Sequence, residues 1–241
     1  MCAVLTLPAP PARRNGRLEP LENGECLTAP EFLRRYEAMP EVKKAELIEG
    51  IVYMPSPVRS DAHAEPDNLI QTWLGTYSAT TPGVKANTNG TVILDFENTP
   101  QPDALVRILP ECGGRSRLDE KGYLVGPPEL VVETAASSTS IDLHDKLRAY
   151  RRNGVKEYLV WRTLDDAVDW FVLVDGDYQR QSPDRKRHLQ SVTLPGLVLN
   201  VPALLAQDGA AVLATLNAAL KRPAHRAFVA KLAAARSVAR K

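Results

Sequence analysis

Two short apolar segments near the middle of the chain constrain its fold most. Residues 101–109 and 126–134 each open with proline or glycine and then run through aliphatic side chains. This pattern is typical of strands that begin directly after turns. Asp103 begins the first segment and Glu133 lies near the end of the second. If the two strands pair antiparallel, the start of one lies beside the end of the other, and the two carboxylates converge.

A helix is predicted directly after the second strand. Residues 138–150 begin with Ser and Thr, continue with spaced apolar side chains, and are followed by Gly154 as a stop signal. Residues 157–161 then form another strand pattern. Strand, helix and strand together predict a βαβ crossover with Lys146 on its helix.

Further elements are expected on both sides of this unit. Residues 28–40 predict a helix that opens with a capping box at Thr28 and Glu31, and Glu41 to Glu46 predict a second short helix. A helix is also expected at 61–78. The remaining strand predictions are 47–54 with a turn at Gly50, 91–96, 167–174, the segment near Tyr178 with a hairpin turn before it, and 196–201.

The length and the changes in composition predict a single α/β domain with extensions. A chain of 241 residues is long enough to bury a full core. Residues 1–24 are rich in Pro, Arg, Asn and Gly and are interpreted as a mobile lead-in. Residues 25–202 hold the mixed α/β pattern. Residues 203–241 are expected to form a basic, Ala-rich helical extension, interrupted at Pro223.

Composition narrows the possible function classes. The formal net charge of +1 gives no overall field of the kind that marks many nucleic-acid binders. Cys2, Cys26 and Cys112 are odd in number and lack metal-ligand spacing, so reduced thiols are expected. No apolar run approaches the roughly 20 residues of a membrane helix, and no signal peptide is evident. A cytoplasmic protein is the expectation.

The two converging acids predict a divalent-cation site, and the lysine beside them predicts phosphate chemistry. Phosphodiester hydrolysis needs an activated water and neutralisation of developing negative charge, and Mg²⁺ or Mn²⁺ held by carboxylates supplies both. Asp103 and Glu133 are the predicted ligands, with Glu46 as an additional acid. Lys146 is the predicted catalytic ammonium. Taken singly, Asp103 could be a turn residue, and Lys146 with Asp142 an ordinary surface pair.

The sequence resembles the Uma2 family of restriction endonuclease-like proteins, within the PD-(D/E)XK nuclease superfamily. The resemblance covers roughly residues 27–200. It is carried by segments 27–32, 46–50, 101–103, 126–133 and 154–158, together with Asp142, Lys146 and Tyr150.

The resemblance implies a restriction-endonuclease-like mixed β-sheet core flanked by helices, a Mg²⁺-dependent endonuclease acting on DNA, and a homodimer. Asp103 and Glu133 match the family's metal-binding acids, Glu46 its acid on the early helix, and Lys146 its lysine. The chain departs from the superfamily pattern at Ala135, where the ExK form has lysine. It departs from the family at Ala135 to Ser138, where similar proteins usually continue with a Ser-Pro pair.

Three features stay open at the level of sequence. His63 lies before the predicted helix 61–78 and is interpreted either as a group that approaches the site or as a solvated histidine. The basic extension is compatible with phosphate contact, a solvated face or an arm that packs on another subunit. The whole protein is compatible with an active endonuclease or with a catalytically silent nucleic-acid-binding or assembly module on the same fold.

Overall fold

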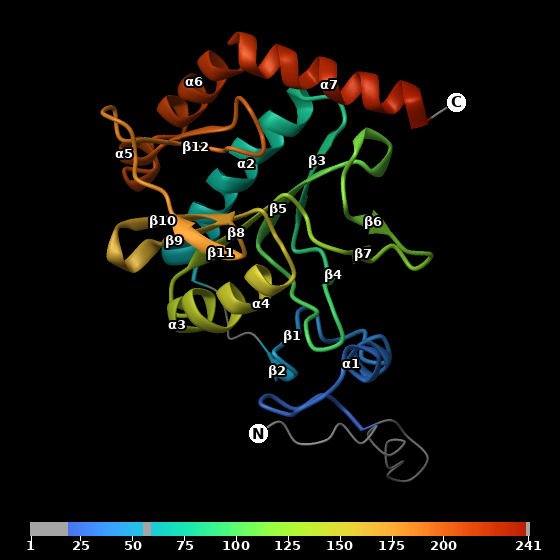
Figure 1. The fold of residues 1–241 in the computed structure, drawn as a ribbon. Coiled ribbons are helices and arrows are strands. Elements are labelled where there is room, and N and C mark those ends of the chain that lie inside the picture. The colour runs from blue at the N-terminus through green and yellow to red at the C-terminus, as the bar shows by residue number, and fades with distance from the viewer. Residues whose placement is uncertain (1–18, 55–58, 240–241) are drawn as a thin grey trace.

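The centre of the protein is a six-stranded mixed β-sheet with strand order β11-β10-β9-β8-β5-β3 (Figure 1). The computed structural model describes residues 19–54 and 59–239. Strands β8 and β9 run parallel, joined by the predicted helical crossover, and the other neighbours are antiparallel. The strands of this sheet are β3 (Val84–Thr88), β5 (Ala104–Ile108), β8 (Leu130–Ala135), β9 (Glu157–Arg162), β10 (Ala167–Val174) and β11 (Asp177–Arg180).

Helices cover both faces of this sheet. Successive side chains of each buried strand point to opposite faces, so each strand packs against both helical layers. Val106 and Val132 pack against α2 (Glu65–Thr80), α6 (Gly209–Leu220) and α7 (Pro223–Ala239). Leu105 and Val131 face the opposite layer, in one buried cluster with Tyr150. That layer is formed by α3 (Thr139–Ile141), a π-helical turn η3 (Asp142–Lys146) and α4 (Leu147–Arg152). The predicted mixed sheet flanked by helices is confirmed.

A small subdomain lies below the sheet in Figure 1 and has its own buried cluster. It consists of α1 (Ala29–Tyr36) and the hairpin of β1 (Glu46–Ile48) and β2 (Ile51–Tyr53). The hairpin turns through Glu49 and Gly50, whose φ angles are 52° and 76°. This is the predicted turn, and glycine adopts that backbone conformation at little cost.

Short elements complete the fold around the main sheet. Two further small sheets are β4 (Val92–Ile93) with β7 (Leu124–Val125) and β6 (Arg117–Leu118), and β12 (His188–Gln190) with β13 (Val198–Asn200). The remaining helical turns are η1 (Ser60–Ala64), η2 (Pro110–Cys112), η4 (Thr163–Asp165) and α5 (Val201–Leu205).

Two local predictions are wrong. No helix covers residues 41–46, and Glu46 begins strand β1 instead. The reason is burial: residues 45–48 are all buried, and hairpin pairing with β2 outweighs the helix propensity of this segment. The capping box at α1 is not formed either. Thr28 makes no side-chain capping bond, and Glu31 pairs with Arg34 and Arg35.

The predicted boundaries of the domain also differ from the observed packing. Of the expected lead-in, residues 1–18 lie outside the described residues, whereas Leu21 is buried against the α1 subdomain. Residues 203–239 are helical as predicted, with Asp208 capping α6. However, Leu216 and Leu232 are buried in the main core. The helical extension is therefore an integral layer of the fold.

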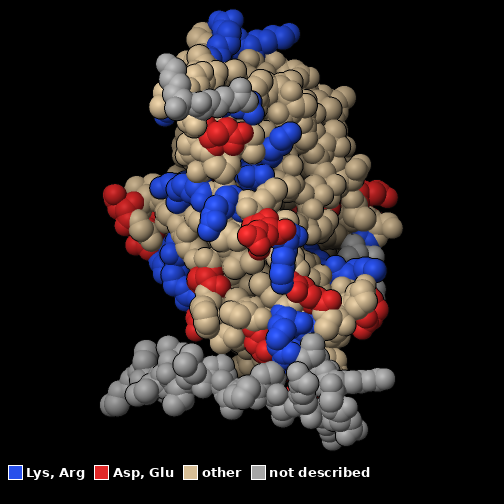
Figure 2. All heavy atoms as spheres, turned by 90° about the vertical axis from the view of Figure 1, so that its right-hand side faces the viewer, with Lys and Arg blue, Asp and Glu red and all other residues tan. Residues whose placement is uncertain are grey.

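Two further properties concern the hydropathy of the helices and the charge of one face. None of the helices in residues 19–54 and 59–239 combines the length and the apolar character that crossing a bilayer requires. Figure 2 shows acidic and basic side chains interleaved on the face that bears β6 and β7. Among the residues that the structure describes, this face carries no large patch of one sign.

Candidate functional site

The register of β5 and β8 places Asp103 opposite Glu133. Ala104 pairs with Val132, so the next step of this antiparallel ladder sets the two acids side by side on the face of Leu105 and Val131. The Asp103 backbone N–H lies 3.5 Å from Glu133 Oε2, and the Thr134 backbone N–H donates to Asp103 Oδ2 at 2.9 Å. Asp103 is therefore bonded across the sheet, unlike a turn residue that caps local amides. The predicted convergence of the two acids is observed.

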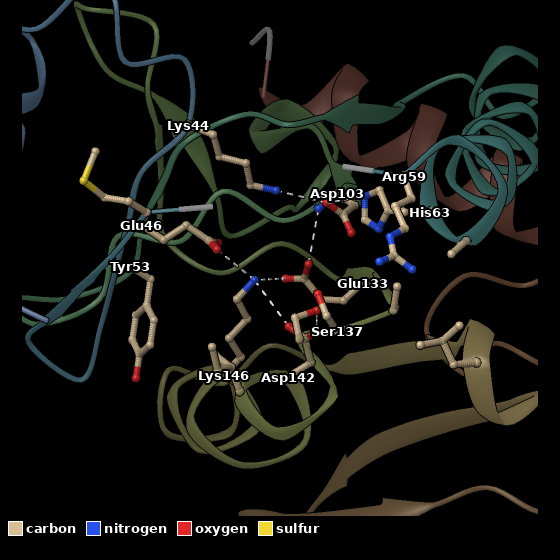
Figure 3. Close-up of a pocket in the computed structure, with 16 residues that line it drawn as sticks. Lys44, Glu46, Tyr53, Arg59, His63, Asp103, Glu133, Ser137, Asp142 and Lys146 are labelled. Carbon is tan, nitrogen blue, oxygen red and sulfur yellow. Dashed lines mark hydrogen bonds and ion pairs between the residues drawn. The ribbon is translucent and has the colours of Figure 1, made fainter. Parts of the chain in front are cut away.

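Lys146 lies at the centre of three carboxylates. Its Nζ is 3.0 Å from Glu133 Oε1, 3.1 Å from Glu46 Oε2 and 3.5 Å from Asp142 Oδ1 (Figure 3). Only 6% of the lysine side chain is exposed. The pair with Asp142 is thus not a surface pair. Burial alone would lower the pKa of Lys146, but the three acids outweigh it and hold that pKa well above its ordinary value.

Glu46 joins the site from the hairpin of the small subdomain. Its Oε1 accepts a hydrogen bond of 2.7 Å from the Gln101 backbone N–H, and its Oε2 faces Lys146. All four predicted site residues are thus brought together, although Glu46 comes from a strand. Ala135 is buried at the end of β8, and the ammonium beside Glu133 belongs to Lys146.

Sequence reasoning missed Lys44. Its Nζ lies 3.0 Å from Asp103 Oδ1, although the two residues are far apart in the chain. The lysine precedes β1 in a segment without regular secondary structure, so no periodic pattern marked it. His63, which the sequence left open, lies within 3.8 Å of the same Asp103 oxygen.

Tyr150 and Asp67 complete the surroundings. The Tyr150 hydroxyl donates to Glu133 Oε1 at 3.0 Å, and the pKa of this buried tyrosine is raised well above its usual value by burial and by Glu133. Asp67 on α2 is buried, and its Oδ1 has no hydrogen-bond partner among the described residues. Burial and the charge of Asp103 raise the pKa of Asp67 to about 6.

The pKa values of Asp103 and Glu133, two of the three predicted metal ligands, are shifted in opposite directions. Burial alone would raise the pKa of Asp103, but Lys44 and Lys146 outweigh burial and hold that pKa below its ordinary value. Burial raises the pKa of Glu133 well above its ordinary value, Asp103 adds to this, and Lys146 opposes it. The pKa of Asp142 is likewise raised, chiefly by burial. One strand therefore presents a firmly charged acid and the next an acid that holds a proton more readily.

These side chains open into a cavity of about 540 Å³. Its volume is within the range of small-molecule sites, roughly 300–1,000 Å³. Figure 3 shows Lys44, Arg59 and His63 on the Asp103 side and Lys146 with Asp142 on the opposite side. The chain's departure from the family pattern also borders this cavity, since Ala136, Ser137 and Ser138 line it.

The donor chemistry of the cavity fits a divalent cation, although the described residues do not present a ready-made set of ligands. Residues 19–54 and 59–239 contain no group of three or more His, Cys, Asp or Glu side chains arranged to hold a metal ion. The acids instead form ion pairs with ammonium groups. Asp103 pairs with Lys44, and Glu46, Glu133 and Asp142 pair with Lys146. Oxygen ligands suit Mg²⁺ or Mn²⁺. Four carboxylates and the three cationic side chains of Lys44, Arg59 and Lys146 line the cavity, so its formal charge of −1 favours a cation.

Asp103 precedes β5, Glu133 lies on its antiparallel neighbour β8, and Lys146 contacts Glu133 from the helical turn that follows β8, within an α/β fold of the nuclease-like class. The sequence model described as "Uma2: Putative restriction endonuclease" matches residues 29–202, and the chain belongs to this family.

A solved structure supports the same fold. It is described as a putative nuclease belonging to DUF820, from Anabaena variabilis. It is 14% identical in sequence with a TM-score of 0.53, and the match covers 72% of this chain and 97% of the other. The comparison with curated proteins gives no match.

Proposed function

We propose that this protein is a divalent-metal-dependent endonuclease that hydrolyses phosphodiester bonds of DNA. The observation that carries the proposal is the convergence of Asp103 and Glu133 beside the buried ammonium of Lys146, at the wall of an accessible cavity. Membership of the Uma2 family supports the reaction class.

Each residue has a distinct part in this proposal. Asp103, Glu133 and Glu46 would hold Mg²⁺ or Mn²⁺, directly or through water. The bound cation would supply Lewis acidity and lower the pKa of its water. Asp103 stays ionised because Lys44 and Lys146 lower its pKa, so it is the more constant of the two strand ligands. Lys146 is held in place by its carboxylate contacts and would position the nucleophilic water.

Cleavage of supercoiled plasmid DNA with Mg²⁺ or Mn²⁺ tests the proposal. Asp103→Asn and Glu133→Gln keep the shapes of the side chains but remove their charges, so we expect at least a hundredfold loss of cleavage. Asp61→Asn is the matched control, because Asp61 is an exposed acid on the neighbouring turn. Equal residual cutting by all four proteins would identify a contaminating nuclease and reject the assignment.

A catalytically silent nucleic-acid-binding or assembly module is the second candidate. The observation that favours it is that every candidate ligand forms an ion pair with Lys44 or Lys146. DNA binding that weakens steeply with salt and does not respond to metal or to Asp103→Asn would support this candidate.

The resemblance also implies a homodimer, and the C-terminal helices are candidates for its contact arm. Deleting residues 203–241 would not test this arm, because the deletion removes Leu216 and Leu232 from the main core. Val238 on α7 is 74% exposed and offers a milder test. Light scattering of Val238→Asp should show a smaller oligomer if α7 forms the contact, and an unchanged mass would remove α7 from consideration.

A further inference from the structure

The two lysines of the site differ in how firmly they are held. Lys146 contacts three acids and is 6% exposed, whereas Lys44 forms, among the described residues, one ion pair with Asp103 and is 26% exposed. Lys44 also belongs to a segment without regular secondary structure. Moving its side chain therefore breaks one ion pair and disturbs no helix or strand. The Lys44 side chain is therefore held by fewer contacts than that of Lys146.

The two carboxylate oxygens of Asp103 also differ in their contacts. Oδ2 accepts the Thr134 backbone N–H across the sheet and is committed to that bond. Oδ1 faces the cavity, where Lys44 lies at 3.0 Å and His63 at 3.8 Å. A cation that enters from the cavity would reach Asp103 through Oδ1. That oxygen is the one occupied by Lys44.

A Lys44 ammonium group that leaves Asp103 would remain at the wall of the cavity. Lys44, Arg59 and His63 line the same side of the cavity (Figure 3), so a displaced Lys44 remains beside other nitrogen-bearing side chains. Lys146 and Asp142 lie on the opposite side of the cavity, across the space that a phosphodiester would enter. A compact ammonium on a flexible stem suits a phosphate oxygen.

We propose that Lys44 competes with the divalent cation for Asp103 and, when the cation displaces it, binds the scissile phosphate. This inference rests on the proposed function, since it requires Asp103 to be a metal ligand. Lys44 then keeps Asp103 neutralised in the free enzyme and becomes a substrate-binding group in the metal-loaded enzyme. Lys146, by contrast, keeps its carboxylate contacts in both states.

The competition has a signature that a merely structural ion pair lacks. Lys44→Met removes the competing ammonium, so calorimetric titration with MnCl₂ should show tighter binding by about tenfold, the order expected for one partly buried charge contact. Lys43→Met is the matched control, because Lys43 is exposed and its ammonium lies on the Pro40 carbonyl. We expect its Mn²⁺ affinity to equal that of the wild type. Equal affinities for Lys44→Met and wild type would overturn the competition.

Cleavage at saturating Mg²⁺ tests the phosphate contact separately. Lys44→Met should lower the plasmid cleavage rate by about a hundredfold despite its tighter metal binding, and Lys44→Arg should recover part of the loss. Wild-type rates for Lys44→Met would overturn this half. A Lys44→Gln variant repeats both measurements if the methionine variant folds poorly.

The same titrations separate this inference from the proposed function. Asp103→Asn should abolish Mn²⁺ binding. If Asp103→Asn binds Mn²⁺ like the wild type, the metal site itself is rejected and the role of Lys44 falls with it. If Asp103→Asn loses binding while Lys44→Met matches the wild type, the metal site stands and the Lys44 inference alone fails.

Discussion

Replacing Lys146 by methionine isolates the energetic role of the buried ammonium. Methionine has a similar length and an unbranched, adaptable side chain, so it fills the space without leaving a cavity. The substitution leaves Glu46, Glu133 and Asp142 without their shared cation. These acids are only 11%, 3% and 2% exposed, so water from the cavity replaces the lost partner only in part.

The expected loss of stability is large. Removing one partner of a buried ion pair costs about 3–5 kcal/mol, because the remaining charge is buried and uncompensated. For a protein of this size a loss of about 4 kcal/mol lowers Tm by roughly 8–16 °C. Protonation of the acids limits the loss, so its size depends on pH.

The direction of that dependence follows from the raised pKa values of Glu133 and Asp142. An acid with a raised pKa in the folded state binds more protons folded than unfolded, so the free energy of unfolding falls as pH rises. Lys146 opposes this effect in the wild type. Its own contribution is fully present below its unfolded pKa of about 10.4 and is lost only above that value. The deficit of the variant should therefore be larger at pH 8 than at pH 5.

Urea denaturation of wild type and Lys146→Met at pH 5 and pH 8, without divalent metal, measures this deficit. Lys156→Met is the matched control, since Lys156 is exposed, and it should stay within about 0.5 kcal/mol of the wild type. A deficit below about 1 kcal/mol at pH 8, or one that is equal at both pH values, would refute the reasoning.

Three further predictions follow from the site and the core. Asp67→Asn should leave the free energy of unfolding unchanged at pH 4 but raise it by about 1 kcal/mol at pH 7, after allowance for solvent screening. The reason is that the raised pKa of Asp67, about 6, costs the folded state stability as pH rises from the unfolded value. Urea titrations at both pH values that show a loss at pH 7 would contradict this. Tyr150→Phe removes a hydrogen-bond donor from Glu133 and should cost about 1–3 kcal/mol in the same assay, and no loss would mean that water replaces the hydroxyl. Leu232→Ala should cost about 2–5 kcal/mol by calorimetry, whereas a loss within 0.5 kcal/mol would show that α7 is not part of the cooperative core.

The arrangement of Asp103, Glu133 and Lys146 was predictable because each lies on an element with a clear signal. Proline and glycine mark the strand starts, the aliphatic runs fix which segments are buried, and a short crossover brings the helix back over the sheet. Antiparallel pairing then sets the two acids opposite each other. The site therefore follows from local patterns and one pairing rule.

The rest depended on contacts that no local pattern encodes. Glu46 was placed on a helix because Lys, Ala, Glu and Leu favour helices, yet burial in the hairpin decided its conformation. Strand β3 has mostly exposed side chains at the edge of the sheet and so lacks an apolar signature. Lys44 reaches Asp103 only through the tertiary fold.

The position of α6 and α7 has a consequence for how this protein is made. Ribosomes add residues at about 5–20 per second, so Lys146 is made several seconds before Leu232. During that interval every candidate catalytic side chain exists, but one apolar face of the sheet lacks the part of its cover that α6 and α7 form. A nascent chain at this stage would be prone to aggregation and would lack a finished scaffold for hydrolysis. The proposed nuclease activity would thus be delayed until α6 and α7 have been synthesised.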